Sequence, residues 1–328
     1  MTRSPPFRGV HCETVATGTL LRAIGYDLSE PMLFGLGEGL AFVFLNLSSL
    51  PLPFLGGRSK PFALTEALCR NLDVNLQAEE TSSHKKSWAR LETCLEKGQP
   101  VGLQLDCYFL PYFRNAPHFA GHFVAAVGRD GADVIVVDTV QQGSVQHVAR
   151  AELEQARHAR GPMSARARAY TVQARSTASR AALGAAALTA IRANAHRYLH
   201  PEFSGMGARG LTKLAVSLPT WLNKAKSPSD DLRLVADLME KAGTGGALFR
   251  NLYRDFLDEV ARLAPADART LRAARDGFAR AAEQWTAIAH LLERCARDGR
   301  AQHLTDAAAL CRSIADAEVA AMRQLAEL

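Results

Sequence analysis

The spacing of hydrophobic residues divides the chain into a mixed first half and a helical second half. In the first half, three stretches carry apolar residues at helical spacing. Gly25 and Gly98 follow the first and the last of these stretches, as expected where helices end. The predicted helices are Glu13–Ile24, Leu64–Leu72 and Ser87–Lys97.

Runs of β-branched and apolar residues follow these helices and predict an antiparallel sheet. The runs are Val101–Asp106, Phe123–Val127, Val134–Val137 and, as a late strand of the same sheet, Ala169–Gln173. The turn signal Arg129-Asp130-Gly131 makes the second and third runs a hairpin. Helices followed by an antiparallel sheet are typical of the α+β class.

The composition shifts to Ala, Ser and Thr between Arg175 and Ala190, and the rest of the chain has helical periodicity. The clearest spans are Asp231–Lys241, Ala247–Leu263, Ala266–Cys295 and Asp306–Leu325. We therefore predict an α+β domain at 1–175 and an all-α helical bundle domain at 176–328.

Composition narrows the functional classes. The chain has 328 residues, 48% of them hydrophobic, and no apolar run long enough for a membrane span or a secretory signal, so we expect a cytoplasmic protein. Six cysteines without a CxxC pair predict reduced thiols and no metal site. The net charge of +6 is spread over dispersed arginines, which favours an acidic protein partner over nucleic acid.

Cys12 lies where a loop becomes the first turn of the first predicted helix. A thiol attacks only as thiolate, and a free cysteine with a pKa of about 8.5 is mostly protonated at neutral pH. The positive end of the helix dipole and an imidazolium partner would both favour the thiolate. His122 is the leading candidate for that partner, because it lies in an otherwise apolar strand.

The predicted hairpin brings a carboxylate to this histidine. If the turn is centred on Asp130, Phe123 pairs with Val137 and His122 pairs with Asp138. Opposed residues share one face of a sheet, with Cβ atoms about 4.5–5.5 Å apart. Asp138 would then orient the imidazole, as the third member of a triad does.

Two other histidines stay open as alternative bases. His118 follows Pro117 in a loop and has no carboxylate opposite it in this register. His11 is adjacent to the cysteine but points elsewhere if the chain is extended there.

Several motifs together resemble the butirosin biosynthesis protein H family. They are His11-Cys12-Glu13-Thr14, Leu28-Ser29-Glu30, the run from Gly35 to Phe42, Gly98-Gln99-Pro100-Val101, the run from Asp106 to Tyr112, the run from His118 to His122, and Asp138-Thr139. The first half looks like the C39-peptidase-like N-terminal domain of that family, and the second half resembles the helical domain of unknown function that accompanies it.

The resemblance implies a papain-like fold and an acyltransferase that moves an aminoacyl group from an acyl carrier protein thioester to an aminoglycoside amine. Cys12 would be the acylated nucleophile, His122 the base and Asp138 its orienting partner. C39 peptidases resemble one another in a glutamine shortly before the nucleophile, and residues 5–10 contain none, which speaks against proteolysis.

Other residues are candidates for substrate binding on the same resemblance. Gln104 is a candidate to replace the missing glutamine, and a glycine-rich loop would let the backbone approach the acyl chain. The candidate substrate-binding residues are Gly35, Gly37, Gly39, Gln104 and Tyr108.

We therefore expect a cysteine-dependent acyltransferase that takes an acyl or aminoacyl group from a carrier protein and passes it to an amine or hydroxyl acceptor. No cofactor is expected, since the substrate arrives on a phosphopantetheine arm. A hydrolase or releasing cyclase with the same triad, and a non-catalytic carrier-binding protein, are the alternatives. The oligomeric state stays open, with a homodimer as one option.

Overall fold

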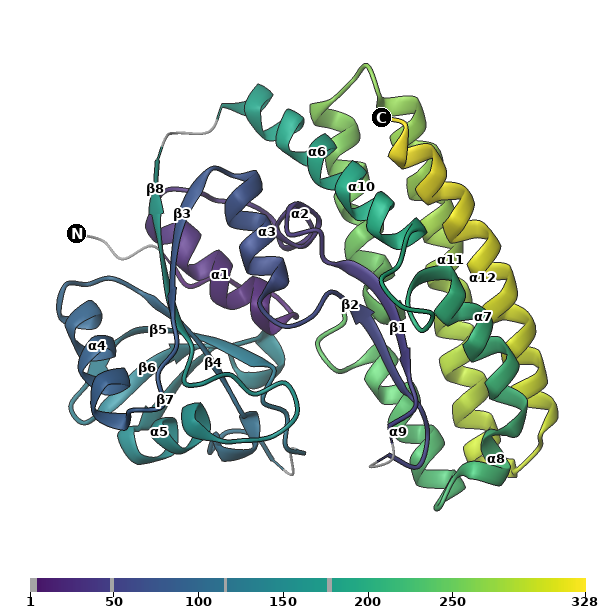
Figure 1. The fold of residues 1–328 in the computed structure, drawn as a ribbon, viewed down its shortest axis with the longest axis horizontal. Coiled ribbons are helices and arrows are strands. Elements are labelled where there is room, and N and C mark those ends of the chain that lie inside the picture. The colour runs from purple at the N-terminus through teal and green to yellow at the C-terminus, as the bar shows by residue number, and fades with distance from the viewer. Residues whose placement is uncertain (1–4, 48–49, 115–116, 176–178) are drawn as a thin grey trace. The chain divides into compact units, whose positions relative to one another are not determined.

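The computed structural model describes residues 5–47, 50–114, 117–175 and 179–328 (Figure 1). The chain forms two compact units, of which the first comprises 1–33 and 60–177 and the second comprises 34–59 and 178–328. The second unit thus includes 34–59, a segment that the apolar pattern assigned to the first domain. The predicted boundary after residue 175 adjoins 176–178, which lie outside the described residues.

The first unit is built around a six-stranded sheet of order β3-β8-β4-β5-β6-β7. Its strands are β3 (Val74–Glu79), β4 (Val101–Leu105), β5 (His122–Asp130), β6 (Asp133–Val137), β7 (Val145–Ala149) and β8 (Ala169–Ala174). Neighbouring strands pair antiparallel, and β8 joins the sheet between β3 and β4. The predicted α+β class, with an antiparallel sheet before a helical region, is confirmed.

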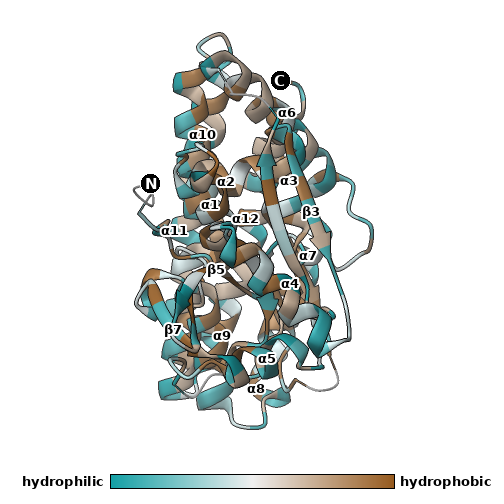
Figure 2. Ribbon diagram, turned by 90° about the vertical axis from the view of Figure 1, so that its left-hand side faces the viewer, coloured by the Kyte–Doolittle hydropathy of each residue, from teal (hydrophilic) through white to brown (hydrophobic). Residues whose placement is uncertain are grey.

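Helices cover both faces of this sheet. The helices of the unit are α1 (Cys12–Ala23), α3 (Ala63–Asn71), α4 (His84–Glu96) and α5 (Arg150–His158), and α2 (Glu30–Leu36) begins in it. Trp88 and Leu91 of α4 pack with Leu103, Val124 and Val136 in one core. On the sheet's other side, α1 packs against β4 and β5. The middle of β5, residues 123–127, is apolar and largely buried, whereas α5 is largely hydrophilic in Figure 2.

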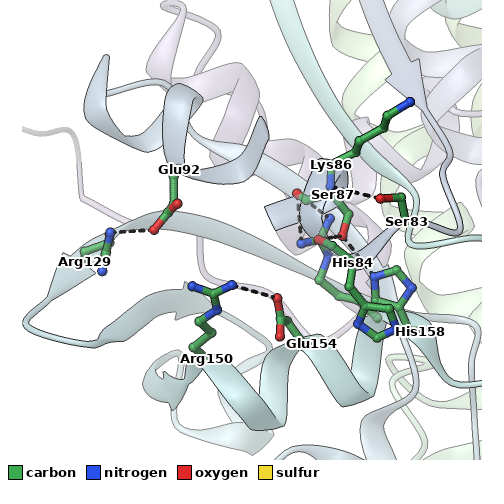
Figure 3. Close-up of polar contacts among 10 residues, drawn as sticks. Ser83, His84, Lys86, Ser87, Glu92, Arg129, Arg150, Glu154 and His158 are labelled. Atoms are coloured by element: carbon green, nitrogen blue, oxygen red, sulfur yellow. Dashed lines mark hydrogen bonds and ion pairs between the residues drawn. The ribbon is translucent and has the colours of Figure 1, made fainter. Parts of the chain in front are cut away.

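Polar contacts fix the edge where α4 and α5 meet (Figure 3). The Ser83 hydroxyl caps α4 by accepting a hydrogen bond from the Lys86 amide. The His84 ring stacks on the His158 ring with centroids 3.7 Å apart. Arg150 and Glu154 of α5 form an ion pair one helical turn apart. Of these contacts, the ring stack joins the two helices, and the other two each stabilise one helix.

The β5–β6 hairpin has a different register from the predicted one. Val137 pairs with Ala125 rather than with Phe123, and the turn lies at residues 131–132 because Asp130 pairs with Asp133. The ladder is irregular between Ala126 and Gly128, where β5 carries one extra residue. The predicted pairing of His122 with Asp138 is therefore wrong as a register.

The second unit is a helical bundle that holds a two-stranded hairpin. The hairpin consists of β1 (Leu40–Leu45) and β2 (Phe54–Arg58). The helices are α6 (Arg180–Leu199), α7 (Gly207–Ser217), α8 (Trp221–Lys224), α9 (Pro228–Glu240), α10 (Arg250–Leu263), α11 (Ala268–Asp298) and α12 (Gln302–Ala326). The central helix α11 packs against α9, α10 and α12.

Helix α10 begins three residues later than its apolar pattern predicts. Ala247, Leu248 and Phe249 all have positive φ, in the left-handed region that non-glycine residues rarely adopt. The ring of Phe249 stacks on Phe34 with centroids 5.4 Å apart. Packing of these apolar side chains therefore offsets the backbone strain and sets the start of α10 at Arg250.

A buried charge pair lies in the core of the second unit. The fully buried guanidinium of Arg250 donates to both carboxylate oxygens of Glu318 at 2.8 and 2.9 Å. Tyr198 and Trp285 also donate to this carboxylate. These hydrogen bonds offset the free-energy cost of burying the two charges, as buried ion pairs in proteins require. Within the described residues, no helix has the length and apolarity that crossing a membrane needs.

Candidate functional site

Cys12 is the first residue of α1, one position earlier than the helix predicted from the sequence. His11 precedes it in an extended conformation, and its side chain does not form the usual N-cap hydrogen bond. The first amides of a helix lack intrahelical partners and carry the positive end of its dipole. The Cys12 side chain thus leaves the backbone at the positive end of the α1 dipole.

The Glu30 carboxylate holds the segment before Cys12. It accepts hydrogen bonds from the backbone amides of Val10 and His11 at 2.8–3.0 Å, and from the hydroxyl of Thr14 at 2.8 Å. Burial raises the pKa of Glu30, and these hydrogen bonds act against that rise. Gly9 lies so close that a Cβ there would be 2.6 Å from a Glu30 oxygen. Glu30 thus fixes the path into α1.

His122 and Asp138 are in direct contact despite the changed register. Nε2 of His122 lies 2.8 Å from Oδ2 of Asp138, and the Tyr112 hydroxyl donates to the same oxygen at 2.9 Å. The other Asp138 oxygen accepts from the amide of Thr139. Asp138 is fully buried and His122 is 6% exposed, so water does not weaken this contact.

Cys12 also acts on His122, because its charge and hydrogen bonding are among the causes that raise the pKa of this histidine. Since Nε2 is engaged by Asp138, Nδ1 is the ring nitrogen left for the sulfur. Burial by itself lowers the pKa of His122, but the negative charges and hydrogen bonds of Asp138 and Cys12 outweigh it and hold that pKa well above the usual range. The ring of Phe113 packs edge-on against His122, with centroids 5.1 Å apart.

A second histidine has a carboxylate partner, contrary to the prediction for His118. Nδ1 of His118 lies 2.9 Å from Oδ2 of Asp106, while the side chain is 62% exposed. The pairing was missed because Asp106 follows β4 rather than the strand opposite in the hairpin. Tyr108, a candidate substrate-binding residue, stacks on the His118 ring with centroids 3.9 Å apart.

Gln104 lies away from His122. In the β4–β5 ladder it pairs with Phe123, whereas His122 pairs with Leu105, so the two side chains leave opposite faces of the sheet. Its amide group donates to the carbonyls of Ala120 and Met163 and accepts from Arg168. The structure therefore gives Gln104 structural contacts on the face away from His122.

The glycine-rich loop belongs to the second unit. A Cβ at Gly35 would lie 2.1 Å from the ring of Phe256, and one at Gly39 would lie 2.7 Å from the ring of Phe34. Gly37 lies between them in the turn after α2. Two of these glycines thus allow close packing inside that unit. Within the described residues, no three His, Cys, Asp or Glu side chains are grouped to hold a metal ion.

Comparison with known families agrees with the motifs at this site. Residues 11–139 match the family model described as butirosin biosynthesis protein H, N-terminal. Residues 151–325, more than half of the chain, match the domain of unknown function DUF4872. No significant match is found among curated proteins. The chain therefore belongs to the butirosin biosynthesis protein H family, in which this N-terminal domain is followed by DUF4872.

Proposed function

We propose that this protein is a cysteine-dependent acyltransferase that receives an acyl or aminoacyl group from a carrier-protein thioester and passes it to an acceptor. The observation that supports this most directly is the buried contact between His122 and Asp138, together with the effect of Cys12 on the pKa of His122. Membership in a family named for a biosynthetic pathway is consistent with such a role.

In the first step, the Cys12 sulfur attacks the thioester carbonyl. A cationic His122, held by Asp138, stabilises the negative sulfur before attack. As the carbonyl carbon–sulfur bond of the donor breaks, the departing thiolate takes the proton of His122. The products are an acyl-Cys12 thioester, a free donor thiol and a neutral His122.

In the second step, the acceptor attacks the acyl-Cys12 carbonyl. The proton released from the acceptor passes to the neutral His122, and the Cys12 thiolate leaves. This restores the imidazolium and thiolate pair, so no proton is gained or lost over the cycle beyond those of donor and acceptor. In the first step one thioester replaces another, so the free energy changes little. Burial of His122 and Asp138 limits the access of water to the acyl-Cys12 thioester.

The oxygen of the attacked carbonyl becomes negative in both steps. We assign its stabilisation to the Cys12 backbone amide, because that amide lies in the first turn of α1. The acyl donor is proposed to be a carrier domain with its substrate on a phosphopantetheine arm. The net charge of +6 suits the acidic surface of such a partner.

Intact mass measurement after a single turnover tests this proposal. Incubation with the model thioester S-acetyl-N-acetylcysteamine should add one acetyl group to Cys12, and an added amine should remove it. Cys12→Ala should form no adduct, while Cys94→Ala, at a half-buried cysteine of α4, should acylate normally. An adduct that persists in Cys12→Ala would exclude Cys12 as nucleophile, and discharge by water as fast as by amine would indicate a hydrolase.

A further inference from the structure

A cleft of about 440 Å³ in the first unit has an excess of positive charge in its lining. Clefts of roughly 300–1,000 Å³ are typical of small-molecule binding sites. The charged residues of the lining are Lys60, Glu80, Arg166 and Arg168, so three cations are present with one carboxylate. The cleft thus carries two positive charges more than its own carboxylate balances, which suits an anionic ligand.

Glu80 holds the two arginines side by side. Its Oε1 accepts a hydrogen bond from Nε of Arg168 at 2.9 Å, and its Oε2 lies 3.6 Å from Nε of Arg166. Partial burial raises the pKa of Glu80, but the hydrogen bonds and charges of these arginines outweigh it and lower that pKa. Glu80 is therefore a fixed anion that positions both guanidinium groups and leaves the cleft cationic.

Arg168 is more enclosed than Arg166, since 23% of its side chain is exposed against 74%. Its guanidinium lies over the ring of Phe62 at 4.4 Å and donates to the Gln104 side chain at 2.7 Å. A guanidinium has five N–H donors, and those of Arg168 make three hydrogen bonds within the described residues. Two N–H groups thus remain for a ligand, and such charge-assisted donors are the ones that proteins use for phosphate.

The loop 159–168 holds a fixed conformation beside the cleft. The Gln104 amide group donates to the Met163 carbonyl at 2.8 Å, and the Ser164 hydroxyl accepts from a backbone amide of the same loop at 3.3 Å. Met163 and Ala167 have positive φ, of 64° and 46°, which non-glycine residues rarely adopt. Strained backbone of this kind is concentrated at ligand-binding segments. The Ser164 hydroxyl lines the cleft and still has its own hydrogen to donate.

We propose that this cleft binds the phosphate group of a phosphorylated small molecule, with Lys60, Arg166 and Arg168 as the residues that contact the phosphate. A phosphate monoester carries a charge of about −1.5 to −2 at pH 7, which matches the excess of two positive charges better than a single carboxylate does. A cleft of this volume also has room for the organic part of the ligand. The proposal is independent of the acyltransferase function, because it concerns binding alone.

Broadening of the ³¹P signal of inorganic phosphate, measured at constant ionic strength, tests the phosphate contacts. The wild-type protein should broaden the signal. The double variant Lys60→Gln/Arg166→Gln should bind phosphate at least about 10-fold more weakly, because a hydrogen bond to a charged group contributes about that factor or more. Arg160→Gln is the matched control, since Arg160 is an exposed arginine of the same loop that does not line the cleft, and it should bind as the wild type does.

Competition with organic phosphates identifies the source of the phosphate group. 4′-Phosphopantetheine and ribose 5-phosphate should displace inorganic phosphate, whereas pantetheine and ribose should not. Stronger displacement by 4′-phosphopantetheine would assign the cleft to the arm of a carrier, and stronger displacement by ribose 5-phosphate would assign it to a phosphorylated sugar. The proposal would be overturned by an unbroadened wild-type signal, by equal binding in the double variant, by an equal loss in Arg160→Gln, or by acetate displacing phosphate as well as the phosphate esters do.

Discussion

The charge on His122 depends on its negative neighbours, Asp138 and the ionised form of Cys12. Cys12 supplies a charge only while its sulfur is ionised, whereas Asp138 is a permanent, fully buried neighbour at 2.8 Å. A buried imidazolium without a compensating carboxylate is costly. In the proposed mechanism, Asp138 therefore keeps His122 cationic before the first step and correctly oriented in the second.

Asp138→Asn tests this dependence. The variant keeps the size of the side chain and one acceptor oxygen, for the Thr139 amide, but it removes the negative charge beside His122. We expect the rate of Cys12 acylation to fall roughly 100- to 10,000-fold, as in triads that lose the carboxylate, with little change in the thermal midpoint. Asp130→Asn, at the exposed carboxylate that faces His147, is the control and should acylate at the wild-type rate. Normal acylation by Asp138→Asn would contradict the orienting role.

The raised pKa of His122 also predicts how stability varies with pH. The folded-state pKa lies above the unfolded value of about 6.5, so the stabilisation is fully present below that pH and is lost as pH rises through the folded-state pKa. The difference in unfolding free energy between wild type and His122→Gln should therefore be largest near pH 6 and shrink toward pH 9. Urea denaturation at about pH 6, 7.5 and 9 measures it. A difference that is constant with pH would rule out a cationic His122.

The sequence grouped Cys12, His122 and Asp138 through residue type and the predicted hairpin, and His122 and Asp138 are in contact. Their catalytic roles stay a prediction. Glu30 was not identifiable in this way. Its partners are backbone amides 19 and 20 residues earlier, and backbone amides leave no trace in a sequence. Asp106 and His118 are 12 residues apart and meet only because a loop folds back on itself.

At the scale of elements, the β5–β6 hairpin shows why a wrong register still led to the right pair. The turn lies later than predicted, and that change alone would place Asp138 level with Ala125 on the face opposite His122. The irregularity between Ala126 and Gly128 shifts the pairing back by one residue. The predicted register is therefore wrong by two residues in total. A shift of two residues keeps His122 and Asp138 on the same face of the sheet, so the two side chains meet diagonally.

The start of α1 depends on a glycine that the sequence pattern did not single out. A Cβ at Gly9 would lie 2.6 Å from Oε1 of Glu30, so Gly9→Ala must displace the carboxylate that holds the Val10 and His11 amides. Displacement of about 1 Å at a reacting group can cost about 100-fold in rate. We expect acylation of Cys12 to slow by up to about that factor, with a stability loss of about 1–3 kcal/mol.

Gly161→Ala is the matched control for this prediction, because no atom lies within 4 Å of a Cβ built there. It should leave acylation and thermal stability unchanged. Single-turnover acylation monitored by intact mass compares the two variants directly. Equal rates in Gly9→Ala and Gly161→Ala would show that the Glu30 contacts do not control the position of Cys12.

At the scale of the whole molecule, the least predictable feature was which segments of the chain belong to each unit. Hydrophobic spacing predicts which segments form strands or helices, but it does not predict which unit a strand joins. The segment 34–59, which contains the β1–β2 hairpin, precedes most of the first unit in sequence and yet belongs to the helical bundle. Its contacts there explain why: Leu40 and Ala41 accept hydrogen bonds from Asn194 and Arg250, and Phe42 stacks on Trp285.

These contacts predict that 178–328 alone does not form a stable domain. Without the hairpin, the fully buried Phe42 is lost, at about 1.5–3 kcal/mol, and the donors of Asn194 and Arg250 lose buried acceptors, at about 1–3 kcal/mol each. The sum is comparable with the total stability of a typical domain, about 5–15 kcal/mol.

We therefore expect no cooperative thermal transition for 178–328, and a cooperative one when 34–59 is joined to its N-terminus by a flexible glycine–serine linker. Phe42→Ala in the linked protein should melt at a lower temperature than its parent. A fragment 178–328 that melts cooperatively at the temperature of the linked protein would show that the hairpin adds nothing to the bundle.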